Sequence, residues 1–450
     1  MVKKHVREVA LDILLQIEKN QAYSNLLLNQ SIKREQLSDK DVGLLTEIVY
    51  GTIQRKNTLD YYLSQFVKGG LKKLDPWVQV LLQLSLYQII YLDRVPQRAI
   101  VHEAVELAKK KGHKGISAMV NGTLRSFIRE GTPTLEKVKD PIEKMSLQLS
   151  HPVWLVERWI EQFGIEKTKA ICEVNSIPPS VTARINKIIA TDVNSVIEKL
   201  AQEEVIAESG DLSPDAIKIT KGSLPNTKLY KEGWLTIQDE SSMLVARALD
   251  PKPGNKVLDS CAAPGGKTTH IAERMNNEGE VYALDLHEHK VSLIEEQARR
   301  LKLTIIKTKA TDSRLAGETF AGESFDCILV DAPCTGLGVI RRKPDIKWQK
   351  KVEDIDSITT IQKAILKAVA PLLKKGGRLV YSTCSIDAAE NDLVVKNFLE
   401  ENSDFQLDIS LKERLPKKLQ DFCNQGTVQL LPSDFQTDGF YIASLTKIKY

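Results

Sequence analysis

The sequence predicts a multidomain protein with an all-helical N-terminal region, a small α+β connector and a C-terminal α/β domain built on a mostly parallel, doubly wound sheet. First, 450 residues are too many for one ordinary hydrophobic core. Second, residues 1–130 carry apolar residues at helical spacing. Third, short apolar runs alternate with helix-length stretches from Glu240 onward, which is the pattern of a parallel sheet. The predicted boundaries are 1–130, 131–150 (a linker), 151–236 and 237–450.

Composition places the chain among folded globular proteins. It is 42% hydrophobic and 27% charged, which excludes disordered and collagen-like classes. The net charge is only +4, but residues 1–130 hold 20 Lys and Arg against 13 Asp and Glu, so the positive excess is N-terminal. An anionic partner is therefore expected on that region.

The cysteines and the apolar stretches indicate the cellular compartment of the protein. Six cysteines without a C-x-x-C pair predict neither a disulfide framework nor a metal site, and fit the reducing cytoplasm. The N-terminus reads as an amphipathic helix and not as an export signal. The most apolar stretch, Trp77 to Leu92, contains polar residues and is shorter than the ~20 residues that span a bilayer. We expect a cytoplasmic protein without a membrane segment.

The helices and strands of the first two regions are predicted from the spacing of apolar residues and from capping residues, glycine and proline. Asp75 is a suitable N-cap and Pro76 a suitable first residue for a buried helix. Glycine and proline after residue 130, and Asp140-Pro141, indicate the linker. Helices are predicted at Val6–Glu18, Asp41–Leu63, Asp75–Leu92, Ala99–Lys111, Ile116–Arg129, Val153–Gln162 and Val193–Gln202. Strands are predicted at Val181–Ile189, Ala216–Ile219 and Trp234–Ile237.

The C-terminal region supplies the sheet. Its strands are predicted at Lys256–Asp259, Val281–Asp285, Leu303–Lys307, Asp326–Asp331, Arg378–Ser382 and Phe440–Leu445. A long helix is expected over Ile358–Lys375, with Gly376-Gly377 closing it as a C-cap. Pro371 inside that stretch predicts a kink or a break.

A loop of small residues follows the first of these strands. Cys261-Ala-Ala-Pro-Gly-Gly-Lys267 lets a backbone approach a ligand closely, and the helix that follows presents free N–H groups. The next strand ends in Asp285, whose carboxylate can accept hydrogen bonds from ribose hydroxyls. A nucleoside-containing ligand is therefore expected. The absence of G-x-G-x-x-G argues against a dinucleotide. A P-loop would need glycine at Cys261, which leaves a nucleotide triphosphatase as a weaker alternative.

Two cysteines follow two later strands. Cys334, in Asp331-Ala-Pro-Cys334, and Cys384, in Ser382-Thr-Cys384-Ser385, come just past the carboxyl ends of the fourth and fifth strands. Ligands of open α/β sheets bind outside those ends, and neighbouring strands are about 4.8 Å apart, so both thiols could face one substrate. A thiolate that attacks carbon 6 of a pyrimidine makes carbon 5 able to accept a methyl group. A base must then remove the carbon 5 proton.

As a set, these motifs resemble the Sun family of RNA cytosine-5 methyltransferases over about residues 236–450. The resemblance includes Asp438-Gly-Phe-Tyr441, which is similar to the family's final antiparallel strand. It implies a Rossmann-like domain that uses S-adenosylmethionine, with Cys384 as nucleophile and Cys334 assisting product release. It also implies cofactor contacts from Cys261, Ala262, Ala263, Pro264, Gly265, Gly266 and Lys267 (methionine end), Asp285 (ribose), Asp312 (adenine region) and Asp331 (junction with cytosine).

Residues 1–130 resemble the NusB-type RNA-binding domain through their helical layout and segments such as Val120-Asn-Gly-Thr-Leu-Arg125. The two domains together are the layout of bacterial methyltransferases of 16S ribosomal RNA, so that RNA is the expected partner of a monomeric enzyme. Candidate phosphate contacts follow Cys334, at Arg341, Arg342, Lys343 and Lys347. Packing is favoured over base stacking for Trp348.

The alternative from another class is a non-catalytic RNA-binding or ribosome assembly factor on the same fold. Loss of catalytic function would be expected to have eroded Asp285, Cys334 or Cys384. All three are present.

Overall fold

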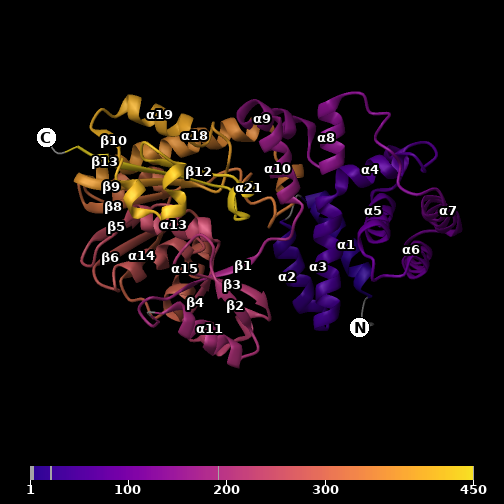
Figure 1. Ribbon diagram of the computed structural model, residues 1–450, viewed down its shortest axis with the longest axis horizontal. Coiled ribbons are helices and arrows are strands. Elements are labelled where there is room, and N and C mark those ends of the chain that lie inside the picture. The colour runs from indigo at the N-terminus through magenta and orange to yellow at the C-terminus, as the bar shows by residue number, and fades with distance from the viewer. Residues whose placement is uncertain (1–4, 21–22, 191, 449–450) are drawn as a thin grey trace. The chain divides into compact units, whose positions relative to one another are not determined.

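The computed structural model describes residues 5–20, 23–190 and 192–448, and the chain divides into two compact units (Figure 1). The first contains the chain up to Ile177 together with Ile340–Lys350. The second contains Pro178–Val339 and the chain from Lys351 onward. The segment predicted as a connector, 151–236, is therefore divided between the units. Its first two helices, at Val153–Phe163 and Ile165–Asn175, belong to the first unit, and everything from Pro178 onward, strands and helices alike, belongs to the second.

The N-terminal part of the first unit is all-helical, as predicted, around one apolar core. Its helices are α1 (Val6–Asn20), α2 (Ser24–Glu35), α3 (Asp39–Gln54), α4 (Lys56–Ser64), α5 (Pro76–Tyr91), α6 (Gln97–Lys111) and α7 (Lys114–Glu130). The single helix predicted over 41–63 is two helices, since Arg55 leaves helical geometry between α3 and α4. Helix α2 was not predicted; only Ser24, Leu28 and Ser31 of it are buried, which gives a weak apolar stripe. No helix within the described ranges is long and apolar enough to cross a membrane.

The remaining helices of the first unit lie partly in the predicted linker. Helix α8 (Pro141–Leu149) corrects that prediction, because the Asp140 carboxylate caps it by accepting from the Glu143 N–H at 2.7 Å. Helices α9 (Val153–Phe163) and α10 (Ile165–Asn175) are separated by Gly164, whose φ of +79° suits glycine. The short α17 (Ile346–Gln349) lies in the inserted segment 340–350.

The second unit begins with a four-stranded antiparallel sheet in the order β2-β3-β1-β4. Its strands are β1 (Val181–Ile185), β2 (Ile206–Ser209), β3 (Ala216–Lys221) and β4 (Leu235–Ile237). Helix α11 (Val193–Gln202) buries Val196 and Leu200 with Ile185 and Ile217 in one small core. The unpredicted strand is β2, an edge strand with no fully buried residue.

The large sheet has the order β11-β12-β13-β9-β8-β5-β6-β7, with β10 paired to β13. The strands are β5 (Lys256–Asp259), β6 (Glu280–Asp285), β7 (Ile306–Ala310), β8 (Phe325–Asp331), β9 (Leu373–Thr383), β10 (Phe405–Leu407), β11 (Cys423–Asn424), β12 (Thr427–Leu430) and β13 (Phe440–Lys447). Strands β5 to β9 are parallel and β13 is antiparallel to β9. The strand order reverses between β5 and β8, the position at which ligands bind in such sheets.

Helices cover both faces of this sheet, which gives the doubly wound fold that the sequence predicts (Figure 1). On one face lie α13 (Glu240–Leu249), α14 (Gly266–Arg274) and α15 (Glu288–Arg300). On the other lie α16 (Ala316–Thr319), α18 (Val352–Val369) and α19 (Asp392–Glu401). Three further short helices are α12 (Lys228–Lys231), α20 (Leu411–Arg414) and α21 (Pro432–Phe435).

The helix predicted over 358–375 ends earlier than expected. Helix α18 stops at Val369, a single 3₁₀ turn contains Pro371, and β9 starts at Leu373. Gly376 and Gly377 therefore lie in a bulge of β9 and are not a helix cap. A Cβ at Gly377 would come within 2.8 Å of the Asp326 carbonyl oxygen, so the close strand approach requires glycine there.

Candidate active site

The two cysteine motifs meet at one edge of the large sheet. Strands β8 and β9 are parallel neighbours, and Asp331 at the end of β8 pairs in register with Ser382 of β9. Cys334 and Cys384 follow those ends, and their Sγ atoms are 3.2 Å apart. The structure thus brings together two thiols that are 50 residues apart in the chain.

An ion pair lies beside the thiols. Lys267 Nζ is 2.8 Å from Asp331 Oδ2 and 5.1 Å from the centre of the Phe440 ring. Ser382 Oγ donates to the other Asp331 oxygen at 2.8 Å. Lys267 ends the small-residue loop that the sequence assigns to the cofactor, yet its ammonium points to the residue at the predicted cytosine junction. The loop motif alone could not show this direction.

Lys267 and Cys334 differ in their charge state. Burial lowers the pKa of Lys267, but the charge and hydrogen bond of Asp331, with a contribution from Cys384, outweigh it and raise that pKa above its ordinary value. The hydrogen bond with Cys384 and burial raise the pKa of Cys334 well above that of an ordinary thiol. Lys267 is therefore a stable cation and Cys334 a neutral thiol at physiological pH.

The small-residue loop passes between β5 and α14. Gly265 has a φ of +101°, and a Cβ there would approach Ile294 Cα at 3.1 Å, so glycine is required. Helix α14 begins at Gly266, which directs its first N–H groups toward the sheet edge. The Ala263 N–H donates to Asp285 Oδ2 at 3.3 Å. The loop is therefore in contact with Asp285, the residue predicted to bind the ribose.

A buried carboxylate under this loop lacks part of its hydrogen bonding. Asp259, the last residue of β5, is fully buried and accepts from Thr268 Oγ1 at 2.7 Å through Oδ2. Its Oδ1 has no hydrogen-bond partner among the described residues. Burial raises the pKa of Asp259 to about 7. A ligand with a cationic or N–H donor group would satisfy this acceptor, as the ammonium of S-adenosylmethionine could.

The loop after β7 brings Asp312 to the same edge. Asp312 accepts from the Arg314 N–H at 2.9 Å and from its guanidinium at 2.6 Å, and these bonds, led by the side-chain one, lower the pKa of Asp312. Ser313 Oγ donates to the Ser260 carbonyl, which attaches this loop to the one after β5. Asp259 and Asp285 thus end two neighbouring strands, and Asp312 comes just after the third.

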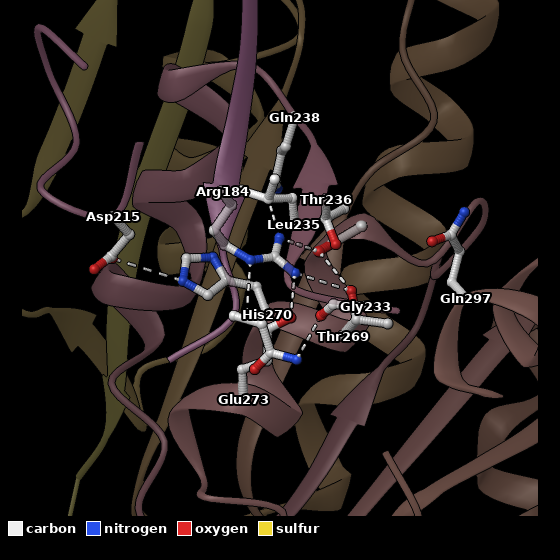
Figure 2. A network of polar contacts seen from close by, with 12 residues as sticks. Arg184, Asp215, Gly233, Leu235, Thr236, Gln238, Thr269, His270, Glu273 and Gln297 are labelled. Atoms are coloured by element: carbon white, nitrogen blue, oxygen red, sulfur yellow. Dashed lines mark hydrogen bonds and ion pairs between the residues drawn. The ribbon is translucent and has the colours of Figure 1, made fainter. Parts of the chain in front are cut away.

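Arg184 of β1 anchors the start of α14 in a network that the sequence reasoning missed (Figure 2). Its guanidinium is fully buried and binds both Glu273 oxygens, at 2.8 and 2.9 Å. It also donates to the Gly266 carbonyl at 2.9 Å, to Thr269 Oγ1 at 3.2 Å and to Gln238 Oε1. The small sheet therefore holds the helix whose first turn belongs to the candidate cofactor site. An arginine within a short apolar strand was the available signal.

The structure corrects part of the predicted RNA contacts. Lys347 is fully buried in the first unit, and its Nζ donates to the Gln54 carbonyl at 3.0 Å. Arg341 is 7% exposed, and its Nε donates to the Ile177 carbonyl at 3.2 Å. Neither side chain can reach a phosphate in this conformation. Arg342 and Lys343 are partly exposed. The Trp348 Nε1–H donates to the Ile53 carbonyl at 2.7 Å, which agrees with packing.

Of the four cysteines outside the thiol pair, Cys261 belongs to the small-residue loop and the other three lie elsewhere. Cys172 and Cys327 are buried, and burial raises the pKa of each. Cys423 lies in β11 and is half-buried. The described residues contain no group of three or more His, Cys, Asp or Glu side chains that could hold a metal ion.

Comparison with known proteins finds related families along most of the chain. Residues 246–446 match the 16S rRNA methyltransferase RsmB/F family, residues 4–129 the NusB family, and residues 151–224 an RsmF/B-like ferredoxin-like domain. The chain is 53% identical over 447 residues to the probable ribosomal RNA small subunit methyltransferase B of Bacillus subtilis strain 168, covering 99% of this chain and 100% of the relative. The chain belongs to the ribosomal RNA small subunit methyltransferase B family. The predicted resemblance to ribosomal RNA methyltransferases with a NusB-type domain is confirmed.

Other relatives extend the same result. The small subunit methyltransferase B of Proteus mirabilis is 35% identical over 415 residues, covering 92% of each chain. The solved structure of PH0851 has a TM-score of 0.83 at 28% identity over 98% of each chain. NSun6 from Pyrococcus horikoshii, solved with SFG, shares the fold, with a TM-score of 0.59 at 23% identity over 66% of this chain and 99% of its own. As a methyltransferase B family member, the protein is a ribosomal RNA methyltransferase with a NusB-like domain and a Rossmann-like catalytic domain.

Proposed function

We propose that this protein methylates carbon 5 of a cytosine in 16S ribosomal RNA, with S-adenosylmethionine as methyl donor and Cys384 as nucleophile. The observation that carries the proposal is the pair of thiols 3.2 Å apart at the ends of β8 and β9. One thiol would be sufficient for a reaction that needs only a nucleophile. Two thiols at one point suit a reaction that needs both bond formation to the base and later release of the product.

The base chemistry explains why a thiolate is needed. Carbon 5 of cytosine is a poor nucleophile in the aromatic ring. A bond from Cys384 Sγ to carbon 6 moves the ring electrons so that carbon 5 can accept the methyl group. After transfer, a base accepts the carbon 5 proton, the electron pair of that C–H bond restores the ring double bond, and the bond between carbon 6 and Sγ breaks to release the thiolate of Cys384.

The electrostatics support the assignment of roles to the two cysteines. The Lys267 ammonium interacts with Cys384, and a nearby cation favours the thiolate form. Cys334 has a raised pKa and stays protonated until Cys384 is occupied by its bond to the base. Removal of the hydrogen bond from Cys384 would then free Cys334 to act in product release.

The residues around β5 fit the donor. Bound S-adenosylmethionine supplies an electrophilic methyl group. The loop from Cys261 to Lys267 would hold its methionine end, with Asp259 Oδ1 accepting from the ammonium. Asp285 would bind the ribose and Asp312 the adenine region, while Asp331 would contact the cytosine. SFG, which was solved with NSun6, is an analogue of this donor.

The first unit would hold the RNA. Residues 1–130 carry a charge excess of +7, and NusB-like domains bind RNA, so this region would contribute phosphate contacts. The target cytosine must leave its stack before a thiol can reach carbon 6. We place the reaction in the cytoplasm, with a single copy of the chain sufficient for it.

Two cysteine variants test the mechanism. C384A should abolish methylation of 16S ribosomal RNA transcripts, because it removes the thiolate proposed to form the bond to carbon 6. C334A should accumulate a protein–RNA adduct that survives a denaturing gel, because release is blocked. Incorporation of a labelled methyl group and bisulfite mapping would measure methylation by each variant, and the denaturing gel would measure the adduct.

C423A is the matched control, since this half-buried cysteine lies outside the site. It should retain turnover and form no stable adduct. Full activity of C384A would exclude the covalent mechanism. Wild-type protein that binds RNA but never methylates it would favour the assembly-factor alternative. Tight ATP binding without S-adenosylmethionine binding would favour a nucleotide triphosphatase, although Lys267 is bound to Asp331 in the structure.

A further inference from the structure

A buried carboxylate connects the two cysteine loops. Glu390 lies between β9 and α19 and is fully buried. Its Oε2 accepts from the Thr335 N–H at 2.8 Å, and its Oε1 accepts from Ser385 Oγ at 2.6 Å and from Thr335 Oγ1. Thr335 directly follows Cys334, and Ser385 directly follows Cys384. One side chain thus binds the residue next to each thiol.

Neighbouring residues complete this attachment. Gln362 of α18 donates from Nε2 to Glu390 Oε2 at 3.2 Å and to the Pro333 carbonyl at 2.9 Å, so it holds the residue before Cys334. Asn391 accepts from Thr383 Oγ1 at 2.6 Å and donates to the Ser385 carbonyl at 3.1 Å. The residues on both sides of each cysteine are therefore fixed by buried hydrogen bonds.

We propose that Glu390 is a positioning residue that sets the spacing of the Cys334 and Cys384 thiols by binding both of their loops at once. The two loops leave different strands. Beyond the strand ends, the Gly338 N–H donates to the Cys384 carbonyl at 2.9 Å, and the Thr335 and Ser385 hydroxyls are 3.3 Å apart. Glu390 adds bonds to the residues that directly follow both thiols. A carboxylate with acceptors on both oxygens can bridge them. Its importance for turnover rests on the proposed function, whereas its effect on thiol spacing does not.

The donors around Glu390 predict how each substitution behaves. Oε2 faces the Thr335 N–H, which can only donate, and the Gln362 NH2, whereas Oε1 faces two hydroxyls that can turn and accept. Glutamine can therefore keep the bridge, with its oxygen at the Oε2 position and its amide nitrogen near the hydroxyls. Aspartate keeps the charge but is one methylene too short to reach both loops.

The glutamine and aspartate substitutions distinguish an effect of side-chain position from an effect of charge. If position is what Glu390 supplies, E390Q should keep most of the wild-type kcat, while E390D and E390A lose about 100-fold, the cost of misplacing reacting groups by about 1 Å. The KM for RNA should change little in all three variants. If the charge were the important property, E390D would be the active variant and E390Q the inactive one.

A second readout does not depend on methylation. Diamide oxidises two thiols to a disulfide and is itself reduced to the hydrazine, so its rate of forming the Cys334–Cys384 bond reports the closeness of the thiols. Peptide mapping of the full-length protein would measure that rate. We expect E390Q to react at nearly the wild-type rate and E390A and E390D to react much more slowly.

Glu240 provides a matched control. It is also buried and accepts from three backbone N–H groups, those of Asp211, Leu212 and Ser213, but it has no contact with the cysteine loops. E240A should lower the melting temperature while leaving the diamide rate and kcat of the folded protein unchanged.

Unchanged kcat and diamide rates in E390D would overturn the proposal, as would E390A losing only stability, in the way expected of E240A. If E390A does not fold, the comparison of E390Q with E390D decides. A C384A variant that methylates normally would contradict the proposed function, but the diamide rates of the Glu390 variants would still test the bridge.

Discussion

Three enclosed basic side chains, two in the second unit and one in the first, have different kinds of partner. In the second unit, Arg184 and Lys267 each contact a carboxylate, Glu273 and Asp331 respectively. In the first unit, Lys347 donates to a carbonyl oxygen of Gln54, and its side chain is fully buried. Burial lowers the pKa of Lys347 well below its ordinary value, whereas the carboxylate partner raises that of Lys267.

The difference shows that a basic residue in a motif does not reveal its own role. Both lysines lie in segments that the sequence associates with function. A carboxylate partner keeps Lys267 charged at the sheet edge, where a charge can act on the nearby thiol. A carbonyl partner is satisfied by a neutral amine as well, so Lys347 serves the packing of the helical unit.

Removing the charge from Arg184 should produce the largest effect on stability. R184M leaves Glu273 buried without a partner and should lower the free energy of unfolding by about 3–5 kcal/mol. The double variant R184M/E273M should recover much of that loss, because an apolar pair of similar volume can replace a buried ion pair. Denaturant unfolding would measure both.

The KM for S-adenosylmethionine adds a sharper test of Arg184. Neither R184M nor R184M/E273M can donate to the Gly266 carbonyl, so the KM should stay raised even where stability recovers. If the KM returned to the wild-type value in the double variant, Arg184 would act on stability alone.

Removing the charge of Lys267 should mainly affect catalysis. K267M leaves Asp331 without its cation and removes the positive charge near Cys384, so kcat should fall roughly 100- to 1,000-fold. Initial rates of methyl transfer would measure this loss. K347M is the comparison variant and should retain kcat. Equal losses in the two variants would contradict the distinction drawn between these lysines.

The smallest effect concerns pH and Lys347. Its pKa in the folded protein lies well below the ordinary 10.5, so between those two values the unfolded chain binds a proton that the folded chain does not. Stability should therefore rise with pH in that window, by up to about 1.4 kcal/mol per pH unit. K347M should lack this contribution. Denaturant unfolding of both proteins at several pH values up to 10.5 checks it, and parallel curves would show that Lys347 is charged when folded.

Much of the fold could be predicted because periodicity is a local property. The run Lys256–Asp259 matches β5 from end to end, and the alternation of strands and helices implied the parallel sheet. Predictions failed where a local signal was ambiguous. Asp140-Pro141 predicts a linker but begins α8, and Gly376-Gly377 predicts a helix cap, whereas Gly377 allows a close contact between strands.

The chain by itself determined the fold class and the chemistry of the sheet edge, because strand ends and short motifs are written in consecutive residues. Only the tertiary structure decided which groups meet. It placed the Cys334 and Cys384 thiols in contact, turned Lys267 toward Asp331, buried Lys347, and brought Arg184 and Glu390 to bind loops far from them in sequence. The physical reason is that hydrogen bonds and ion pairs between distant segments depend on side-chain direction and burial, and neither is encoded by spacing along the chain.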